Sequence, residues 1–296
     1  MELRVLGYFL AVAREQSIIR AAESLHLSQP TLSTQIRNME EELGKRLLIR
    51  GTKGSRKVTL TEEGMILKKR AEEILNLVEK TEKEITLSDN IIVGDVYIGT
   101  GETEAFRFLA KAAKEIQEQY PGIHYHISSG NAEFVLEQLD KGLIDFGIVF
   151  GNVDSVKYNS LKMSVSDTWG VLMPKDCALA EKESITPEDL LDKPLILSHQ
   201  RNQASPFGTW MNCDIEKLNV AATYNLLFNA SLMVEEGLGY AVGLDKIIYT
   251  GKESSLCFRP LNPGIEAEMY IVWKKYQIFS KAAEQFMQKI NVMRRS

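Results

Sequence analysis

Residues 28–43 read SQPTLSTQIRNMEEEL, a stretch that predicts a capped helix with one apolar face. Ser28 is a favourable N-cap residue and Pro30 is well tolerated in a first helical turn, so we expect the helix from about residue 29 to residue 43. Its apolar residues recur at helical spacing and are Leu32, Ile36, Met39 and Leu43. The other faces carry short hydrogen-bond donors and acceptors, which suit the edges of bases in a DNA groove.

Two shorter helices are expected ahead of this one. The first has an apolar face with spacings of three and four, formed by Leu3, Leu6, Phe9, Leu10 and Ala13. Ser17 offers a cap for the second helix, in which the small side chains of Ala21 and Ala22 permit close approach of a neighbouring helix. Three helices in this arrangement predict a helix-turn-helix whose third helix enters a major groove.

A basic segment follows the third helix. Residues 44–58 contain no acid, three glycines and six cations, which are Lys45, Arg46, Arg50, Lys53, Arg56 and Lys57. This composition predicts a hairpin, or wing, that contacts phosphates. A solvated loop with incidental charge is the alternative for such a run taken alone, but its position after a helix-turn-helix favours the wing.

A long helix is expected next. Apolar or small residues recur with alternating spacings of four and three from Leu60 to Ile85, which is the a/d seam of a heptad repeat. A helix over residues 61–86 would be about 39 Å long. The seam indicates dimerisation through this helix; the alternative is packing against the chain's own body.

Beyond residue 90 the pattern predicts alternating strands and helices, that is, α/β architecture. We expect strands at 96–99, 124–128, 144–150, 161–165, 169–173, 195–197, 221–224, 240–242 and 267–273. We expect helices at 103–119, 132–141, 205–218, 231–237 and 280–293.

Composition limits the class of protein. The 296 residues are 44% hydrophobic and suit two or three globular domains. The net charge is −5, yet residues 1–60 carry ten basic and six acidic side chains, which suggests that the first segment meets a polyanion. Three widely spaced cysteines support neither a disulfide framework nor a zinc site, so no cofactor is expected. Without a long apolar run or a secretory start, we expect a cytoplasmic protein that makes no membrane contact.

Two other functions remain as alternatives. An enzyme could use an α/β cleft, but Gly99-x-Gly101-x-x-Glu104 lacks the third glycine of the dinucleotide fingerprint, and no nucleophile elbow or P-loop is present, so no enzyme is predicted. A solute-binding protein without a regulatory role would require export. The basic helical segment at the N-terminus argues against it.

Over essentially its full length the chain resembles the LysR-type transcriptional regulators. The residues that carry the resemblance are Phe9-Leu10-Ala11-Val12-Ala13, Ser17, Ala21-Ala22, Leu25, Leu27-Ser28-Gln29-Pro30-Thr31-Leu32-Ser33, Ile36, Glu40, Leu43-Gly44, Leu47, Arg50, Leu60-Thr61-x-x-Gly64, Leu143 to Ile148, Leu190 to Ile196 and Val234 to Val242.

The resemblance implies three parts. They are a winged helix-turn-helix head at 1–60, a linker and dimerisation helix at 61–88, and a periplasmic-binding-protein-like effector domain at 91–296. Its two α/β subdomains would be 91–161 with 266–296, and 162–265. The implied partners are double-stranded DNA with dyad-like half-sites, a small-molecule effector, further copies of the chain as a dimer and a tetramer, and RNA polymerase.

On DNA, Gln29 can pair bidentately with adenine, and Thr31 and Thr34 can offer a methyl to thymine or a hydroxyl to a base or phosphate. The candidate DNA-binding residues are Ser28, Gln29, Pro30, Thr31, Ser33, Thr34, Arg37, Arg50, Lys53, Arg56 and Lys57. The chain departs from the family at Thr34, where arginine is common, and at Leu48-Ile49, where Phe-Glu is common. Because of Thr34, the base preference need not follow the usual one of the family, whereas the change at Leu48-Ile49 is expected to alter local packing and leave the fold intact.

Effector candidates follow from the rule that ligands of open α/β sheets collect at the carboxyl ends of strands, beside helix N-termini. They are Thr100, Gly101, Glu102, Ser128, Ser129, Gly130 and Asn131 on one wall, and His199, Gln200, Phe228 and Asn229 on the other. Thr100, Ser128 and Ser129 could instead cap helices, and His199 could be structural. Glu102 would repel an acidic effector, so an amine-bearing or zwitterionic ligand stays open. His124-x-His126 lacks a third ligand, and no metal is expected there.

Overall fold

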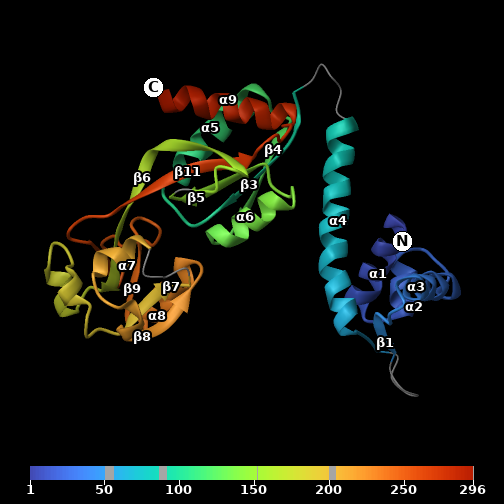
Figure 1. The fold of residues 1–296 in the computed structure, drawn as a ribbon, viewed down its shortest axis with the longest axis horizontal. Coiled ribbons are helices and arrows are strands. Elements are labelled where there is room, and N and C mark those ends of the chain that lie inside the picture. The colour runs from blue at the N-terminus through green and yellow to red at the C-terminus, as the bar shows by residue number, and fades with distance from the viewer. Residues whose placement is uncertain (51–56, 87–91, 152, 200–204, 296) are drawn as a thin grey trace. The chain divides into compact units, whose positions relative to one another are not determined.

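The computed structural model describes residues 1–50, 57–86, 92–151, 153–199 and 205–295. The chain divides into two compact units, Met1–Leu87 and Ser88–Ser296 (Figure 1). Each unit has its own hydrophobic core.

The N-terminal unit contains the three predicted helices. They are α1 (Leu3–Glu15), α2 (Ile18–Ser24) and α3 (Gln29–Leu43), and the two short strands β1 (Leu48–Arg50) and β2 (Val58–Leu60) form an antiparallel pair after them. Ser17 caps α2 by accepting from the Arg20 amide, and Ser28 caps α3 by accepting from the Thr31 amide at 3.3 Å. Phe9, Leu32 and Ile36 are fully buried between these helices. The predicted bounds of α3 and its apolar face are confirmed, except that Leu43 is 41% exposed.

Helix α4 (Glu62–Thr86) begins directly after β2, and its heptad seam divides into two parts. Ala71 is fully buried, and Leu67 and Leu75 pack against the core of the same unit. The seam residue Ile74, next to Leu75, is 36% exposed, and Ile85 near the end of the helix is 77% exposed. The alternative of packing against the chain's own body therefore applies to the first half of the helix, whereas the second half presents its apolar residues to solvent.

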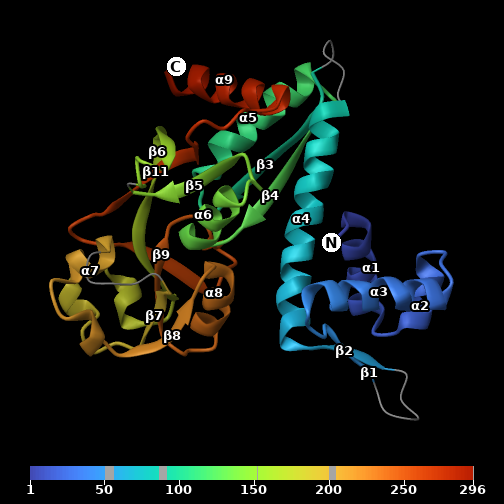
Figure 2. The ribbon, with the colours of Figure 1, turned by 45° about the vertical axis from the view of Figure 1, so that its right-hand side comes forward.

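The C-terminal unit is built on one long mixed sheet of two subdomains (Figure 2). Its strands, over the described residues, are β3 (Gly94–Thr100), β4 (Ile123–Ser129), β5 (Phe146–Phe150), β6 (Tyr158–Pro174), β7 (Leu195–Ser198), β8 (Val220–Tyr224), β9 (Tyr240–Leu244), β10 (Leu256–Pro260) and β11 (Glu266–Lys274). They lie in the order β4-β3-β5-β11-β6-β9-β7-β8, with β10 on β6. The antiparallel pair β6 and β11 runs from one subdomain into the other.

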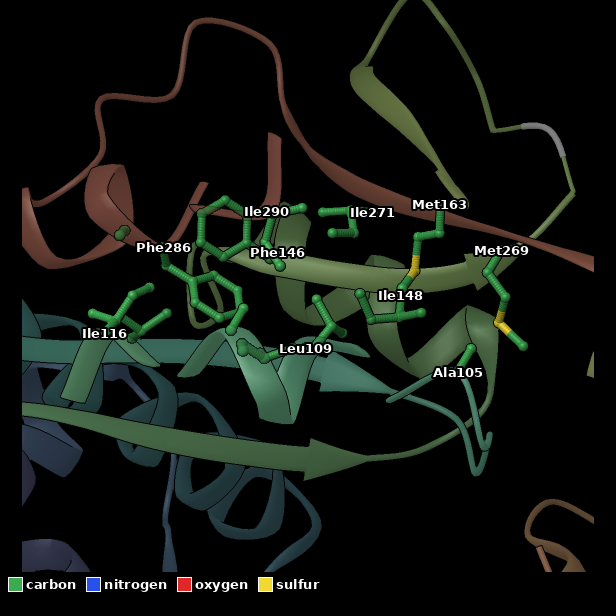
Figure 3. Close-up of a cluster of buried hydrophobic side chains, with 14 of the residues drawn as sticks. Ala105, Leu109, Ile116, Phe146, Ile148, Met163, Met269, Ile271, Phe286 and Ile290 are labelled. Carbon is green, nitrogen blue, oxygen red and sulfur yellow. The ribbon is translucent and has the colours of Figure 1, made fainter. Parts of the chain in front are cut away.

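Helices cover the sheet of the first subdomain on both faces. Helices α5 (Phe106–Gln119) and α9 (Lys281–Arg295) lie on one face and α6 (Ala132–Asp140) on the other. Figure 3 shows Leu109 of α5, Phe146 of β5 and Phe286 of α9 meeting in the core beneath α5 and α9. In the second subdomain α7 (Pro206–Met211) and α8 (Leu227–Glu235) cover β7, β8 and β9.

The structure differs from the expected elements in four places. Residues 161–165 and 169–173 belong to one strand, β6, because the polar residues between them stay extended and the Asp167 carboxylate accepts from Thr103 Oγ1 at 2.6 Å. The helix expected over 205–218 ends at Met211, where Asn212 adopts φ +47°, and only a short 3-10 turn follows. Strand β10 was not predicted.

The fourth correction concerns α8, which begins at Leu227 rather than at residue 231. Ser231 resembles a helix cap in sequence, but its hydroxyl donates to the Phe228 carbonyl one turn back at 2.7 Å. Phe228 and Asn229, expected before the helix, therefore lie in its first turn.

Candidate functional site

The candidate DNA-reading residues lie on the outward side of α3. Ser28, Gln29, Pro30, Thr31, Thr34 and Arg37 are exposed, and Ser33 is half-buried. Ser28 and Thr31 also share a hydrogen bond of 2.7 Å between their hydroxyls, so both belong to the helix cap. Gln29 and Thr34 stand in the first two turns with no capping role.

Side chains of α3 and of the residue before α4 form hydrogen bonds to the backbone of the wing and of α4. Glu40 Oε1 accepts from the amides of Leu47 and Leu48 at 2.7 and 3.1 Å. Thr61 Oγ1 donates to the Arg46 carbonyl at 2.8 Å and accepts from the Gly64 amide at 3.0 Å. These contacts fix the orientation of α3 relative to the two strands that follow it.

The structure describes part of the basic wing. Arg50 ends β1, Lys57 is exposed beside β2, and Lys53 and Arg56 lie outside the described residues. Lys45 is exposed and pairs with Glu63 at 3.5 Å. Lys45 therefore lies close to the C-terminal end of α3, whereas Arg50 and Lys57 stand at the end of the strand pair where Arg50 faces Val58.

A cavity of about 370 Å³ lies between the two subdomains of the C-terminal unit. From the first subdomain it is lined by Gly101, Glu102, Gly130, Asn131, Ala132, Ile148, Val149, Phe150 and Gly151. From β6 and β11 come Trp169, Glu266, Ala267 and Glu268. From the second subdomain come Leu197, Ser198, Ser205, Pro206, Phe207, Tyr224, Asn225, Leu227, Val242, Gly243, Leu244 and Ile247.

Some of the effector candidates line this cavity and others do not. Gly101, Glu102, Gly130 and Asn131 line it. The candidates that do not line it are Thr100, Ser128, Ser129, His199, Phe228 and Asn229, and Gln200 lies outside the described residues. Thr100 is 4% exposed and donates to the Gly101 carbonyl at 2.9 Å, while Phe228 is 59% exposed on the outer side of α8.

The helices at the cleft are capped by Asn131 and Ser205, and not by Ser128 or Ser129, which were candidate caps. Asn131 Oδ1 accepts from the Phe134 amide at 3.0 Å and caps α6. Ser205 caps α7 by accepting from the Gly208 amide at 3.0 Å. Neither Ser128 nor Ser129 caps α6.

Several cavity residues were missed by sequence reasoning. Val149 and Phe150 end β5, so the rule that ligands collect at the carboxyl ends of strands would have found them. Trp169 and Tyr224 carry no local signal, because their positions follow from the crossing of β6 and from the pairing of β7 with β8.

Glu102 crosses the cleft. Its Oε2 accepts a short hydrogen bond from the Leu227 amide at the N-terminus of α8, which links the first subdomain to the second. Burial, reinforced by the nearby Glu102 charge, raises the pKa of the Tyr224 hydroxyl, which donates to the Val242 carbonyl at 2.6 Å. The carboxylate therefore points into the cavity, and the helix N-terminus provides its partner.

No metal centre emerges from the described residues, in which no three His, Cys, Asp or Glu side chains form a ligand group. His126 instead stacks on Tyr97 and its Nε2 lies 3.1 Å from Asp95 Oδ1. Within the described chain, every helix is too short or too polar to cross a membrane.

Comparison with known proteins agrees with both units. Residues 3–65 match the model of the bacterial regulatory helix-turn-helix protein, lysR family, and residues 92–292 match the LysR substrate binding domain. Two relatives from Bacillus subtilis are the uncharacterized HTH-type transcriptional regulator YvbU, 28% identical over 97% of each chain, and the HTH-type transcriptional regulator BsdA, 32% identical over 74% of each chain.

The fold also matches a solved structure. Full-length CbnR in complex with its target DNA has a TM-score of 0.75 at 16% identity, covering 99% of this chain and 100% of that one. The chain therefore belongs to the LysR family of DNA-binding transcriptional regulators, with a helix-turn-helix unit followed by an effector-binding domain.

Proposed function

We propose that this regulator binds an operator as a dimer, with one α3 in each of two major grooves, and that a small molecule in the cleft controls its output. The observation that carries the proposal is the outward side of α3. Its first two turns expose Gln29, Thr31 and Thr34, while Leu32 and Ile36 anchor the opposite side in the core. A helix held this way presents rigid side chains to base edges.

Base recognition and backbone contact fall to different residues. Gln29 can pair with the N6 and N7 positions of adenine, and a good bidentate contact contributes about 1–3 kcal/mol of discrimination. Phosphates would be neutralised by Lys45, Arg46, Lys53, Arg56 and Lys57. Each phosphate contacted makes the negative slope of log K against log salt steeper by about 0.9.

The second half of α4 supports the proposed dimer. Ile74, Leu77 and Ile85 are exposed there, and Leu77 is 42% exposed. Burial of such residues against a second copy of α4 would stabilise the pair by about 25 cal/mol per Å² of apolar surface. A dimer would place two copies of α3 on two half-sites.

Effector binding is coupled to transcription in this proposal by closure of the two subdomains over the cavity. Closure would change the arrangement of dimers in a tetramer, and with it DNA bending or the contact with RNA polymerase. The ligand can shift this balance only by its difference in affinity for the open and closed forms. We place the regulator in the cytoplasm, where its DNA and its effector meet.

Fluorescence anisotropy with the DNA flanking its own gene tests the proposal. We expect Gln29→Ala to lower operator affinity about 10-fold while leaving random DNA unaffected, because it removes one base contact. Arg56→Ala should weaken both DNAs alike and reduce the salt slope. Gln288→Ala, an exposed substitution in α9, serves as the control. Equal losses on operator and random DNA for Gln29→Ala, or affinity that does not change with salt, would contradict the proposal.

A further inference from the structure

The described lining of the cavity between the subdomains is acidic. Its described lining includes Glu102, Glu266 and Glu268 and contains no lysine, arginine or histidine. Glu268 is paired with Lys162 at 2.5 Å. Among the described residues, Glu266 accepts from the hydroxyl groups of Ser166 at 2.8 Å and Thr168 at 3.2 Å. Two carboxylates of the lining, Glu102 and Glu266, therefore form no ion pair with a described lysine, arginine or histidine.

At each of three helix N-termini near the cavity, one backbone amide already has a side-chain acceptor. Asn131 caps α6, Ser205 caps α7, and Glu102 accepts from the first amide of α8. Free helical N–H groups are the usual receptors for anionic ligands, and each of these three helices uses one of them for a side chain of the protein. A carboxylate ligand would meet Glu102 and Glu266 and would find fewer free helical donors than uncapped termini offer.

The remaining walls are apolar and aromatic. Phe150 comes from the first subdomain, Trp169 from the crossing strand β6, and Phe207 from the second subdomain. Aromatic faces attract organic cations as well as burying hydrocarbon. A cavity of about 370 Å³ falls within the range of small-molecule sites.

We propose that the effector is an organic ammonium ion with an apolar body, and that its cation pairs with the Glu102 carboxylate. This inference rests on the proposed role of the cavity as the effector site. Only Oε2 of Glu102 is bonded to Leu227, so Oε1 is without a protein partner among the described residues. A charge-assisted hydrogen bond to Oε1, in a cavity partly shielded from water, is stronger than one to a neutral acceptor. The ligand is then tied through Glu102 to α8 on the opposite subdomain.

Three probes of similar shape test the sign of the ligand. Isothermal titration calorimetry of the full chain would compare 2-phenylethylamine, 2-phenylethanol and 3-phenylpropanoate. We expect the amine to bind at least about 10-fold more tightly than the other two. Glu102→Gln keeps an oxygen for the Leu227 amide but removes the charge, so amine affinity should fall about 10- to 100-fold while alcohol affinity changes little. Glu104→Gln is the matched control, because Glu104 pairs with Arg107 and does not line this cavity.

The outcomes separate this inference from the proposed function. Tighter binding of 3-phenylpropanoate, or an amine affinity indifferent to Glu102→Gln, would overturn the ammonium assignment and leave an effector site of another kind. Absence of amine binding at about 10 mM would overturn it as well. Failure of the ligand-free wild type to bind operator DNA would instead contradict the proposed function, because that measurement involves no probe.

Discussion

Gly64→Ala should destabilise the N-terminal unit, because the first turn of α4 leaves no room for a side chain at this position. A Cβ on Gly64 would lie 2.2 Å from the Leu47 carbonyl oxygen, a backbone atom. That oxygen also accepts from the Thr61 amide at 3.0 Å. On its other side Leu47 is held by Glu40, whose Oε1 accepts from the Leu47 amide at 2.7 Å. The carbonyl therefore cannot retreat without breaking a hydrogen bond.

The expected loss follows from these distances. Ordinary van der Waals contact begins near 3.4 Å, so the carbonyl and α4 must separate by about 1 Å. Overpacking of this kind costs about 1–3 kcal/mol, and the strained Thr61 amide bond adds about 1 kcal/mol. Replacing a helical glycine with alanine returns about 0.5–1 kcal/mol. We expect a net decrease of about 1–3.5 kcal/mol in the unfolding free energy of this unit.

Gly7→Ala is the matched control, since the same chemical change in α1 has the opposite sign. A Cβ on Gly7 would have no other heavy atom within 4 Å. The substitution should therefore stabilise the unit by about 0.4–1 kcal/mol, because alanine restricts the unfolded chain.

Urea unfolding with two signals measures both variants. Far-UV circular dichroism includes the helices of the N-terminal unit, whereas the three tryptophans, Trp169, Trp210 and Trp273, all report on the C-terminal unit. Gly64→Ala should shift the circular dichroism transition to lower urea and leave the tryptophan transition unchanged. Equal unfolding free energies for the Gly64→Ala and Gly7→Ala proteins would refute the steric reasoning, and a shifted tryptophan transition would refute the assignment to one unit.

Three further changes probe capping and charge. Glu40→Ala should destabilise the N-terminal unit by about 1–3 kcal/mol in urea unfolding, because two backbone amides lose their acceptor; a change below about 0.5 kcal/mol would contradict this. Asn131→Ala should cost about 1 kcal/mol by removing the cap of α6, measured by hydrogen exchange of the Phe134 amide, whose unchanged protection would show that another acceptor replaces Asn131. Burial acts to raise the pKa of Asp189, but hydrogen bonds from Lys182 and the Thr186 amide outweigh it, and the net effect lowers the pKa below 3.8. The native state therefore favours the charged form of Asp189. Asp189→Asn should therefore cost about 1–2 kcal/mol at pH 7, and this cost should disappear as the pH falls below about 4; a pH-independent cost would contradict the charge assignment.

The N-terminal unit could be predicted from sequence because its signals are local. The bounds of α3 follow from Ser28 as cap and from an apolar face of period 3.6. Both signals lie within the stretch of residues 28–43. The role of Glu40 was not predictable in the same way. Its carboxylate acts on the backbone of Leu47 and Leu48, which only the turn after α3 brings within reach.

The sequence predicted the α/β class of the C-terminal unit, but it did not predict that β6 is one continuous strand. Alternating apolar runs identify the strands, yet the continuity of β6 depends on Asp167 finding donors on the loop before α5. Burial raises the pKa of Asp167, and the hydrogen bond from Thr103 partly offsets that shift. From sequence alone, Ser166-Asp167-Thr168 has the composition of a turn. Tertiary partners decide whether this segment forms a turn or an extended strand, because an extended polar segment needs hydrogen-bond acceptors and donors from other parts of the chain.

The misplaced start of α8 and the unexpected partner of Glu102 have one physical cause. Leu226, at the N-cap of α8, has no side-chain acceptor, so the sequence carries no signal for a helix beginning at Leu227. A helix that begins without a local cap leaves its first amides unsatisfied, and a carboxylate is the favoured partner for such a terminus. Glu102 supplies that carboxylate from 125 residues away. Glu102 was expected to repel an anionic ligand, and in the structure its own carboxylate occupies the anion-binding position at the N-terminus of α8. The charge of the cavity, and the class of ligand that it selects, therefore depends on the fold of both subdomains together.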